Sequence, residues 1–263
     1  MMDKFIESCS YGDISFENLV YKGITLDDIN LDMVQEYCDL IKYNGTSEEY
    51  IIKDNITVAS ILLFGKDPQK YLPHACIRFI KYKDNDVVDS KVFNGTIWDM
   101  LNDSISYIEK QIDGKYIWKE LIVNAVCHRD YSILDKEIII RLFDDRLIVE
   151  SPGGLPNLIN LYNIMSTHYS RNPIIAKYLR GYKVVNELGE GINRIYNDIE
   201  KSKFFNISFI EDDSFFKAII IKREVEDFKD KEFCCDIWHH LWQNSVINKV
   251  LVTWFYIDGL LFN

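Results

Sequence analysis

Residues 120–131 read ELIVNAVCHRDY, and this segment carries the strongest indications of both the fold and the candidate site. Glu120 and Asn124 are four residues apart, so on a helix both side chains project from one face, one turn apart. The amide oxygen of Asn124 suits Mg²⁺, and the carboxylate of Glu120 can orient or deprotonate a water molecule that attacks a phosphoryl group. The simpler interpretation is an amphipathic helix whose polar face is only solvated.

Two pairs of glycines follow this predicted helix. Gly153 and Gly154 come directly after a predicted strand, and glycine allows backbone conformations that bring the chain close to a ligand. Gly189 and Gly191 precede a predicted helix, where free N–H groups and the helix dipole favour phosphate. The polar segment 157–172 between the pairs could fold over a ligand. Each pair alone is a weak signal, because turns account for most such pairs, but their order fits a nucleotide pocket.

The remaining pattern predicts a chain that mixes helices and strands, behind an extended arm over residues 1–20. Apolar residues at helical spacing, several of them behind a capping residue, predict helices over residues 26–42, 57–64, 96–114, 117–128, 173–180 and 191–201. Short β-branched and aromatic runs predict strands over residues 75–82, 137–143, 146–150, 205–210 and 215–222. For residues 57–64 a buried strand remains an alternative, because the apolar run is unbroken.

The composition limits the class of protein. The chain has 263 residues, of which 48% are hydrophobic, so it is long and apolar enough to bury a core. Its formal net charge is −11 and its pI is about 5.0. Such a chain is not expected to bind nucleic acid through its own broad electrostatics, because Lys and Arg provide most phosphate binding. Any contact with DNA would need a local patch or a partner.

The cysteines and the apolar runs predict a cytoplasmic protein. Six cysteines are scattered along the chain and no secretory leader precedes them, which fits reduced thiols. No apolar run reaches the ~18 to 20 residues that cross a bilayer, so no membrane contact is expected. Cys234, Cys235, His239 and His240 suggest zinc, but adjacent cysteines lack the spacing of ordinary zinc sites. The Trp and Phe residues near them could dock on another subunit, which would give a homodimer.

Several phrases of the sequence together resemble a known superfamily of ATP-binding proteins. Glu120, Asn124 and Ala125, followed by His128, resemble the N box of the superfamily that includes gyrase, histidine kinases and mismatch-repair ATPases. One branch is similar over roughly residues 20–222: the bacterial and archaeal proteins described as RecG-like helicases or as Schlafen/AlbA-domain transcriptional regulators. The phrases that carry this likeness are LLFGKDPQKYLPHACIRF (62–79), VNAVCHRDYS (123–132), SPGGLP (151–156), SRNPIIA (170–176) and ELGEGINRI (187–195).

The resemblance implies a fold class and a division of the chain. The fold would be α+β, an α/β sandwich of the GHKL or Bergerat type, with a mixed, mostly antiparallel sheet covered by helices on one face. Residues 1–50 would form an N-terminal arm and linker helix, and residues 51–222 the ATP-binding domain. Residues 223–263 would be a C-terminal tail, interpreted as the remnant of a winged helix. Relative to the family, the chain would be truncated at both ends.

The resemblance also implies Mg²⁺ and ATP as cofactors and gives roles to single residues. Asn124 would be the Mg²⁺ ligand, and Glu120 the catalytic base that orients water. Gly153 and Gly154 would line the adenine side, and Gly189 and Gly191 would contact the phosphates. Candidates with a weaker basis, which could support the pocket or contact the nucleotide, are His128, Arg129, Ser151 and Arg171.

Two departures from the family pattern limit what the resemblance implies. Ser151 stands where the wider superfamily has an Asp that accepts a hydrogen bond from adenine, and where the similar branch usually has Asn. A serine hydroxyl reaches less far, so selectivity for adenine is weakened. The chain also lacks the G-x-x-x-x-G-K-[ST] phosphate loop, so it is not expected to be a P-loop helicase.

Three functional hypotheses follow. The first is an ATP-binding domain of a transcriptional regulator that binds Mg-ATP and hydrolyses it slowly or not at all. The second is a degenerate interaction module that keeps the fold without turnover. The third is a DNA-associated regulator that acts through an oligomer or a partner, and the acidic net charge weighs against it for this chain alone.

Overall fold

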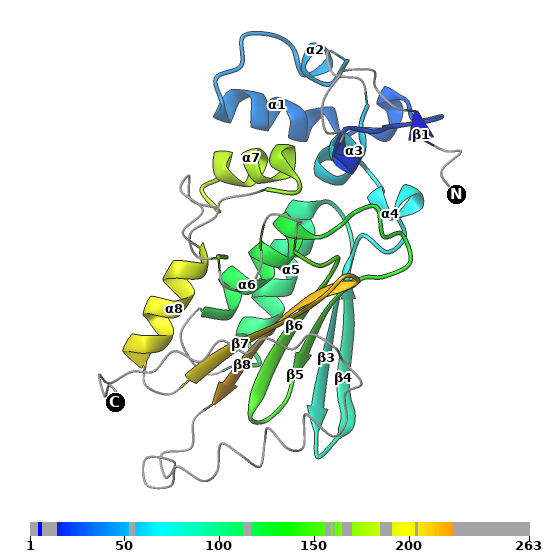
Figure 1. Cartoon of the computed structure of the whole chain (residues 1–263). Coiled ribbons are helices and arrows are strands. Elements are labelled where there is room, and N and C mark those ends of the chain that lie inside the picture. The colour runs from blue at the N-terminus through cyan, green and yellow to red at the C-terminus, as the bar shows by residue number, and fades with distance from the viewer. Residues whose placement is uncertain are drawn as a thin grey trace, which may run out of the picture.

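A six-stranded sheet organises the fold, with the strand order β4-β3-β5-β6-β8-β7 (Figure 1). Its strands are β3 (Ile77–Lys83), β4 (Asp86–Phe93), β5 (Ile138–Leu142), β6 (Arg146–Pro152), β7 (Phe205–Asp212) and β8 (Phe215–Lys222). β3 and β5 are parallel and the other neighbours are antiparallel. The computed structural model describes residues 5–6, 15–52, 56–112, 117–155, 159, 161, 163–164, 170–184, 191–202 and 205–222. The predicted mixed, mostly antiparallel sheet is therefore confirmed.

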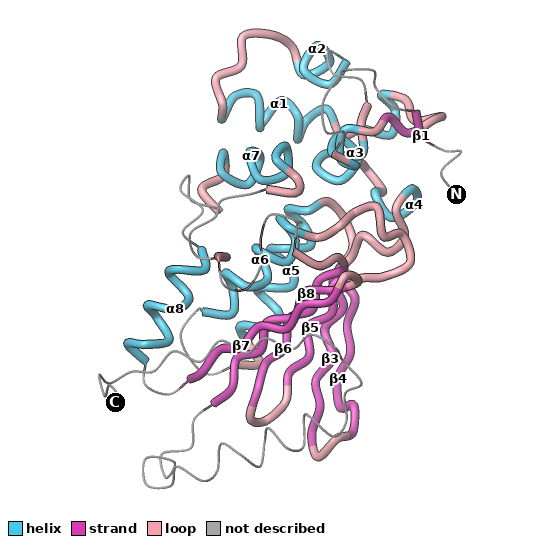
Figure 2. The backbone as a smooth tube through the Cα atoms, in the orientation of Figure 1, coloured by secondary structure: helices cyan, strands magenta, loops and turns pink. Residues whose placement is uncertain are grey.

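Helices cover one face of this sheet (Figure 2). They are α5 (Ile97–Glu109), α6 (Ile117–His128) and α8 (Gly191–Ser202), which contact β3 and β4, β6, and β7 respectively. The inward side chains of the strands, such as Phe79, Ile140 and Val149, are buried beneath them. The alternate positions on β5, β6 and β8 carry an ion-paired group, Arg141, Glu150 and Lys217. This alternation has the period of two that a half-buried sheet requires.

A second group of helices lies beyond one end of the sheet (Figure 1). It comprises α1 (Leu31–Leu40), α2 (Ser47–Ile52), α3 (Val58–Phe64), α4 (Pro68–Tyr71) and α7 (Pro173–Gly181), and the short antiparallel pair β1 (Phe5–Ile6) and β2 (Val20–Tyr21) lies beside it. Aromatic side chains join α1, α3 and α7: the ring of Tyr37 lies 4.8 Å from that of Tyr178 and 5.9 Å from that of Phe64. Packing of such rings is a strong source of apolar burial.

Local capping explains where two of these helices begin. Thr57 accepts a hydrogen bond from Ser60 N at 3.3 Å, and Ser60 accepts one from Thr57 N at 3.3 Å. Thr96 and Asp99 form the same reciprocal box at the start of α5, with distances of 2.9 and 3.2 Å. Both boxes satisfy N–H groups that a helix end leaves unpaired. The helix predicted for residues 57–64 is confirmed, and its alternative strand is wrong.

The helix predicted for residues 26–42 is wrong in its first turn. Thr25 and Asp28 do form a capping box, but it closes a 3-10 turn, η3 (Leu26–Asp28). Ile29 is extended and pairs with Gly65, and Asn30 N donates to Phe64 O at 2.8 Å. Asn30 then caps α1 by accepting from Met33 N at 3.3 Å. A contact with a distant segment therefore interrupts a run whose apolar spacing is helical.

The sequence prediction also missed the edge strand β4. The turn before it consists of Asp84 and Asn85, whose φ angles are 50° and 73°. Two residues with positive φ are the requirement for a tight hairpin turn, and Asp and Asn tolerate it best after glycine. This local signal was present in the sequence. The hairpins predicted over residues 137–150 and 205–222 are confirmed as β5–β6 and β7–β8.

Three further predictions concern membrane spans, the C-terminal tail and the division of the chain. No helix that the structure describes is long and apolar enough to span a membrane. Residues 223–263, with Cys234, Cys235, His239 and His240, lie outside the described part of the chain, so the tail stays a prediction. The division into residues 1–50, 51–222 and 223–263 also stays a prediction.

Candidate functional site

Glu120 and Asn124 lie on the same face of α6, as their spacing predicts. Ile122 and Val126 are fully buried on the side of α6 that packs against the sheet. Glu120 is mostly buried, with 19% of its side chain exposed, and Asn124 is half-buried. The carboxamide of Asn124 has no hydrogen-bond partner among the residues that the structure describes. The polar face of α6 therefore combines a mostly buried carboxylate with a carboxamide that is free to bind.

The first residue of α8 lies directly against this polar face. A Cβ atom added to Gly191 would overlap Oε1 of Glu120 and would lie 3.3 Å from both terminal atoms of Asn124. Only a residue without a side chain brings the start of α8 this close. The structure thus brings together three of the predicted site residues, Glu120, Asn124 and Gly191. Gly189 lies outside the described residues.

The charge of Glu120 is balanced by an arginine that the sequence analysis did not select. Nη2 of Arg194, on α8, donates to Oε1 of Glu120 at 3.1 Å. Burial raises the pKa of the Glu120 carboxyl, and Arg194 opposes that rise through its charge and its hydrogen bond. No local sequence signal pairs the two residues, which lie 74 positions apart.

The donor set fits a hydrated magnesium ion. Mg²⁺ prefers oxygen ligands and keeps several waters, so the amide oxygen of Asn124 can serve as a protein ligand while water and phosphate oxygens supply the others, and Glu120 stays available for water. No group of three or more His, Cys, Asp or Glu that could bind a metal occurs among the described residues. The N–H groups in the first turn of α8 add a favourable end for an anion. The arrangement can therefore bind a metal–phosphate unit between α6 and α8.

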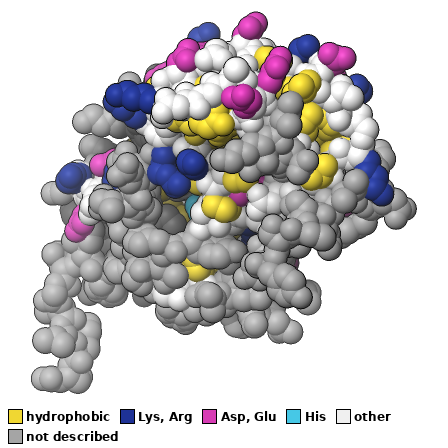
Figure 3. Space-filling model, turned by 90° about the horizontal axis from the view of Figure 1, so that it is seen from above, with side chains coloured by type: hydrophobic (Ala, Val, Ile, Leu, Met, Phe, Trp, Pro, Cys, Tyr) yellow, Lys and Arg dark blue, Asp and Glu magenta, His cyan; other side chains and the backbone are white. Residues whose placement is uncertain are grey.

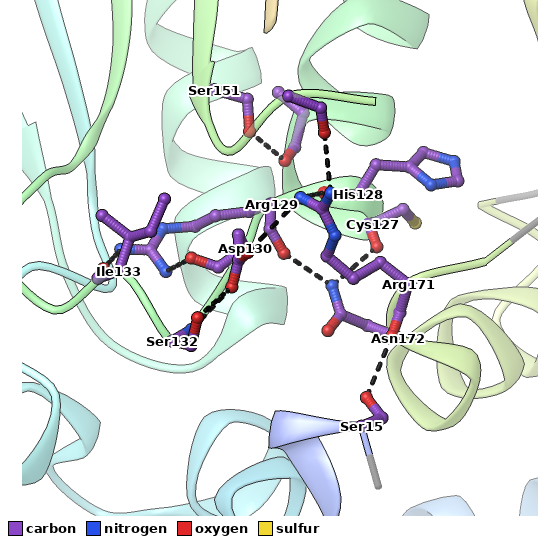
Figure 4. Close-up of polar contacts among 12 residues, drawn as sticks. Ser15, Cys127, His128, Arg129, Asp130, Ser132, Ile133, Ser151, Arg171 and Asn172 are labelled. Atoms are coloured by element: carbon purple, nitrogen blue, oxygen red, sulfur yellow. Dashed lines mark hydrogen bonds and ion pairs between the residues drawn. The ribbon is translucent and has the colours of Figure 1, made fainter. Parts of the chain in front are cut away.

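Side chains from other segments bind the last turn of α6, and those of Ser151, Arg171 and Asn172 are seen in Figure 4. The final carbonyls of a helix have no partner within the helix and must find one elsewhere when they are buried. Four side chains supply donors to five carbonyls. Ala125 O accepts from Ser151 at 2.9 Å, Val126 O from Tyr131 at 3.1 Å and His128 O from Arg171 at 3.2 Å, while the amide of Asn172 donates to both Cys127 O at 2.9 Å and Arg129 O at 2.8 Å.

These contacts give Ser151 and Arg171 structural roles. Ser151 is buried, and its hydroxyl donates to Ala125, so its predicted contact with adenine stays a prediction without support from the geometry. Arg171 also donates to Gly154 O at 2.7 Å and lies 3.9 Å from the carboxylate of Asp130. Its charge is therefore partly compensated within the protein. The phosphate contact predicted for Arg171 would have to compete with these partners.

Packing explains the first glycine pair. Gly153 has a φ of 92°, and a Cβ atom there would overlap Nη1 of Arg171 and Cβ of Asp130. A Cβ atom on Gly154 would overlap the carbonyl oxygen of Asp212. The close approach that the glycines allow is thus to the protein itself. Their predicted place beside adenine stays a prediction.

The geometry of Arg129 fits support of the pocket, and its phosphate contact stays a prediction without support from the geometry. Its side chain is 2% exposed and lies 4.7 Å over the ring of Tyr131. Both terminal nitrogens of its guanidinium donate to backbone carbonyls of the loop after α6 and of a neighbouring loop, and its buried Nε has no partner among the described residues. These acceptors are Asp130 O at 3.0 Å, Ile133 O at 3.0 Å, Lys136 O at 2.6 Å and His74 O at 3.3 Å. The side chain of His128, by contrast, is exposed and remains a candidate.

The N-terminus of α7 is capped from the far end of the chain. Glu17, in the 3-10 turn η2 (Phe16–Asn18), is fully buried and accepts from Ile174 N at 2.8 Å and from Ile175 N at 3.1 Å. Burial raises the pKa of this carboxyl against the lowering effect of the two N–H groups. Asn172 occupies the N-cap position of α7, but its side chain makes no capping hydrogen bond and its amide donates to the end of α6 instead. The predicted start of this helix at residue 173 is confirmed, while the side-chain cap comes from Glu17.

Replacing Asn172 with alanine is expected to lower the free energy of unfolding by about 2–3 kcal/mol. The buried carbonyls of Cys127 and Arg129 would lose their donor, and an unsatisfied buried acceptor costs about 1–3 kcal/mol. Chemical denaturation followed by circular dichroism measures the loss. Asn102, exposed on α5, is the matched control, and its alanine variant should stay within about 0.5 kcal/mol of the wild type. Equal stability of the two variants would contradict the capping role.

Comparisons with known proteins agree with this geometry at the level of the fold. A family model described as putative ATP-dependent DNA helicase RecG C-terminal matches residues 135–220, about a third of the chain. The crystal structure of the DIP2311 protein from Corynebacterium diphtheriae is similar, with a TM-score of 0.61 and 18% identity, over 88% of this chain and 54% of that chain. This chain thus spans about half the length of that protein. No curated protein matches the sequence.

The family match supports an ATPase-like domain in this chain. The family match begins after α6, so it covers the strands β5 to β8 with α7 and α8, but neither Glu120 nor Asn124. At 18% identity the similar crystal structure shows the fold alone.

Proposed function

We propose that this chain binds a magnesium–ATP complex between the polar face of α6 and the N-terminus of α8. The observation that carries the proposal is the approach of Gly191 to Glu120 and Asn124. The N-terminus of α8, an end that favours anions, thus lies beside an amide oxygen that suits Mg²⁺ and a carboxylate that can orient water. The match of residues 135–220 to an ATPase-like family supports the same assignment.

Each residue of this site has a distinct role in the proposal. The amide oxygen of Asn124 binds the metal, and the first N–H groups of α8 bind phosphate oxygens. Mg²⁺, when bound, neutralises phosphate charge and polarises the phosphoryl group. Glu120 orients the water molecule that attacks, and its raised pKa brings the carboxyl nearer the range in which a base accepts a proton. Hydrolysis is expected to be slow, because Glu120 is paired with Arg194.

We further propose that the nucleotide state of the domain is read by a partner, as in a transcriptional regulator of the cytoplasm. The net charge of −11 weighs against DNA binding by this chain itself. On the face seen in Figure 3, the described Lys and Arg side chains are interspersed with acidic, apolar and uncharged ones. Contact with DNA would then come through the partner or through a homodimer.

A second candidate function is nucleotide binding without turnover. The ion pair between Arg194 and Glu120 favours it, because a carboxylate bound to a guanidinium is a weak base. The structural roles of Ser151 and Arg171 point the same way, since they leave fewer side chains for catalysis.

Calorimetric titration with ATP, in Mg²⁺ and then in EDTA, tests the proposed site. The wild type is expected to bind Mg-ATP, and the Asn124→Ala variant is expected to lose about tenfold or more in affinity, because it loses the metal ligand. Asn102→Ala on α5 is the control and should bind as the wild type does. Absence of magnesium-dependent binding by the wild type at millimolar ATP would sink the proposal.

Phosphate release separates the two candidate functions. In the Glu120→Gln variant, Mg-ATP binding is expected to persist while turnover falls by about a hundredfold, the usual contribution of a general base. Glu109→Gln, which changes an exposed ion pair with Lys119, is the matched control. If the wild type binds Mg-ATP but releases no phosphate, the non-catalytic module is the correct alternative.

A further inference from the structure

Among the described residues, Arg194 is the one ion-pair partner of Glu120, yet only part of its guanidinium is hydrogen-bonded. Nη2 donates to Glu120, while the buried Nε has no hydrogen-bond partner among the described residues. The side chain as a whole is 42% exposed. One donor of Arg194 is therefore bound to the carboxylate, while another lacks an acceptor. A buried donor without an acceptor normally lowers the stability of the fold.

The position of Arg194 on α8 directs it to the same site as Gly191. Residues three apart on a helix lie on one face, so Arg194 is on the side of α8 that meets Glu120 and Asn124. It belongs to the first turn, beside the N–H groups assigned above to phosphate. A guanidinium presents its donors as a planar fork that matches phosphate oxygens.

We propose that Arg194 is a phosphate-binding residue that exchanges Glu120 for a phosphate oxygen when the nucleotide binds. This inference rests on the proposed function and deepens it. Without phosphate, Arg194 keeps the carboxylate in an ion pair. When phosphate is present, the guanidinium donates to an oxygen of the phosphate group, which carries more negative charge than the carboxylate does. The carboxylate of Glu120 then becomes available to orient water. Arg194 would thus couple occupancy of the site to the availability of its base.

A double-mutant cycle tests the exchange. Dissociation constants for ATP and for adenosine, both in Mg²⁺, are measured for the wild type, Arg194→Gln, Glu120→Gln and the double variant. Arg194→Gln is expected to weaken ATP binding about tenfold, the value of a charge-assisted hydrogen bond, and to leave adenosine binding unchanged. Glu120→Gln is expected to tighten ATP binding, and this effect should be about threefold larger in the wild-type background than in Arg194→Gln. The reason is that loss of the carboxylate frees the guanidinium for phosphate only when Arg194 is present.

A purely structural Arg194 predicts a different result. If Arg194 only shields the negative charge of Glu120, the Glu120→Gln change should tighten ATP binding more when Arg194 is absent. The inference would be overturned by any of three results. These are greater tightening by Glu120→Gln when Arg194 is absent, unchanged ATP affinity in Arg194→Gln, and an equal loss of ATP and adenosine binding in Arg194→Gln. Arg146→Gln, at an exposed ion pair with Asp145, is the matched control.

Two further readouts keep the outcomes distinct. Thermal unfolding establishes that each variant folds. If Arg194→Gln does not fold, Arg194→Lys replaces it and is expected to bind ATP more weakly than the wild type, because an ammonium lacks the planar fork of the guanidinium. If the wild type itself does not bind Mg-ATP, the proposed function fails and the exchange fails with it. If the wild type and Arg194→Gln bind equally, the exchange alone fails.

Discussion

Replacement of Arg129 with methionine is expected to lower the free energy of unfolding by about 3–5 kcal/mol, because the guanidinium serves several buried carbonyls and an unsatisfied buried acceptor costs about 1–3 kcal/mol. Methionine can fill much of the volume, but the carbonyls of His74, Ile133 and Lys136 would lose the donor that the guanidinium supplies, and Asp130 O would keep only Ile133 N. Those carbonyls belong to the loop after α6 and to the loop before β3, so both loops should loosen together. Guanidinium chloride unfolding, followed by circular dichroism, measures the change.

Arg146→Met is the matched control for this variant. Arg146 is also paired, with Asp145 at 2.9 Å, and also lies over an aromatic ring, that of Phe143. It begins β6 beside a hairpin turn, however, with 38% of its side chain exposed, and an ion pair at such a surface position contributes about 0–1 kcal/mol. Similar losses in the two variants would mean that burial of Arg129 is not what makes it important.

Gly153→Ala is expected to destabilise the protein by about 2–4 kcal/mol, the sum of backbone strain and overpacking. The strain arises because φ at this position is 92°, a conformation that L side chains rarely adopt. The overpacking arises because the new methyl group would overlap Arg171 and Asp130. Arg171 would have to move and would lose its hydrogen bonds to His128 O and Gly154 O. Chemical denaturation measures the loss.

Gly191→Ala provides the contrast that separates packing from binding. Its methyl group would overlap only the end of the Glu120 side chain, which can rotate away, so the stability should change by less than about 1 kcal/mol. Rotation of Glu120 would nevertheless displace the carboxylate from the site, and Mg-ATP affinity should fall about tenfold. A Gly153→Ala variant as stable as Gly191→Ala would contradict the structural account of the first glycine pair.

The elements that could be predicted from the sequence are those whose signals are local. The hairpins β5–β6 and β7–β8 follow from short apolar runs around polar turns, and α3, α5 and α7 from capping residues or a first-turn proline before apolar spacing. The common face of Glu120 and Asn124 on α6 is local in the same sense, because it depends only on a spacing of four.

The parts that could not be predicted depend on contacts between distant segments. Helical spacing places Asn172 before α7, but only the fold shows that its amide reaches α6 instead. Arg129 lies in a motif where a basic residue suggests phosphate, and nothing local shows that carbonyls surround it. The pairing of Arg194 with Glu120 is equally non-local. In each case the same residue type serves a ligand or a structural role, and burial decides between them.

The cap that Glu17 provides to α7 sets a constraint on the order of folding. Its two hydrogen bonds join residues 157 and 158 positions apart, and the bond from Ser15 to Arg171 O spans 156. During synthesis, Glu17 cannot form these hydrogen bonds until Ile174 and Ile175 have been made, so its carboxylate is solvated until then. Contacts of such long sequence separation slow folding, because the loop between them must close first. The N-terminal helices and the sheet are thus expected to become stable together, as one cooperative unit, rather than in the order in which they are made.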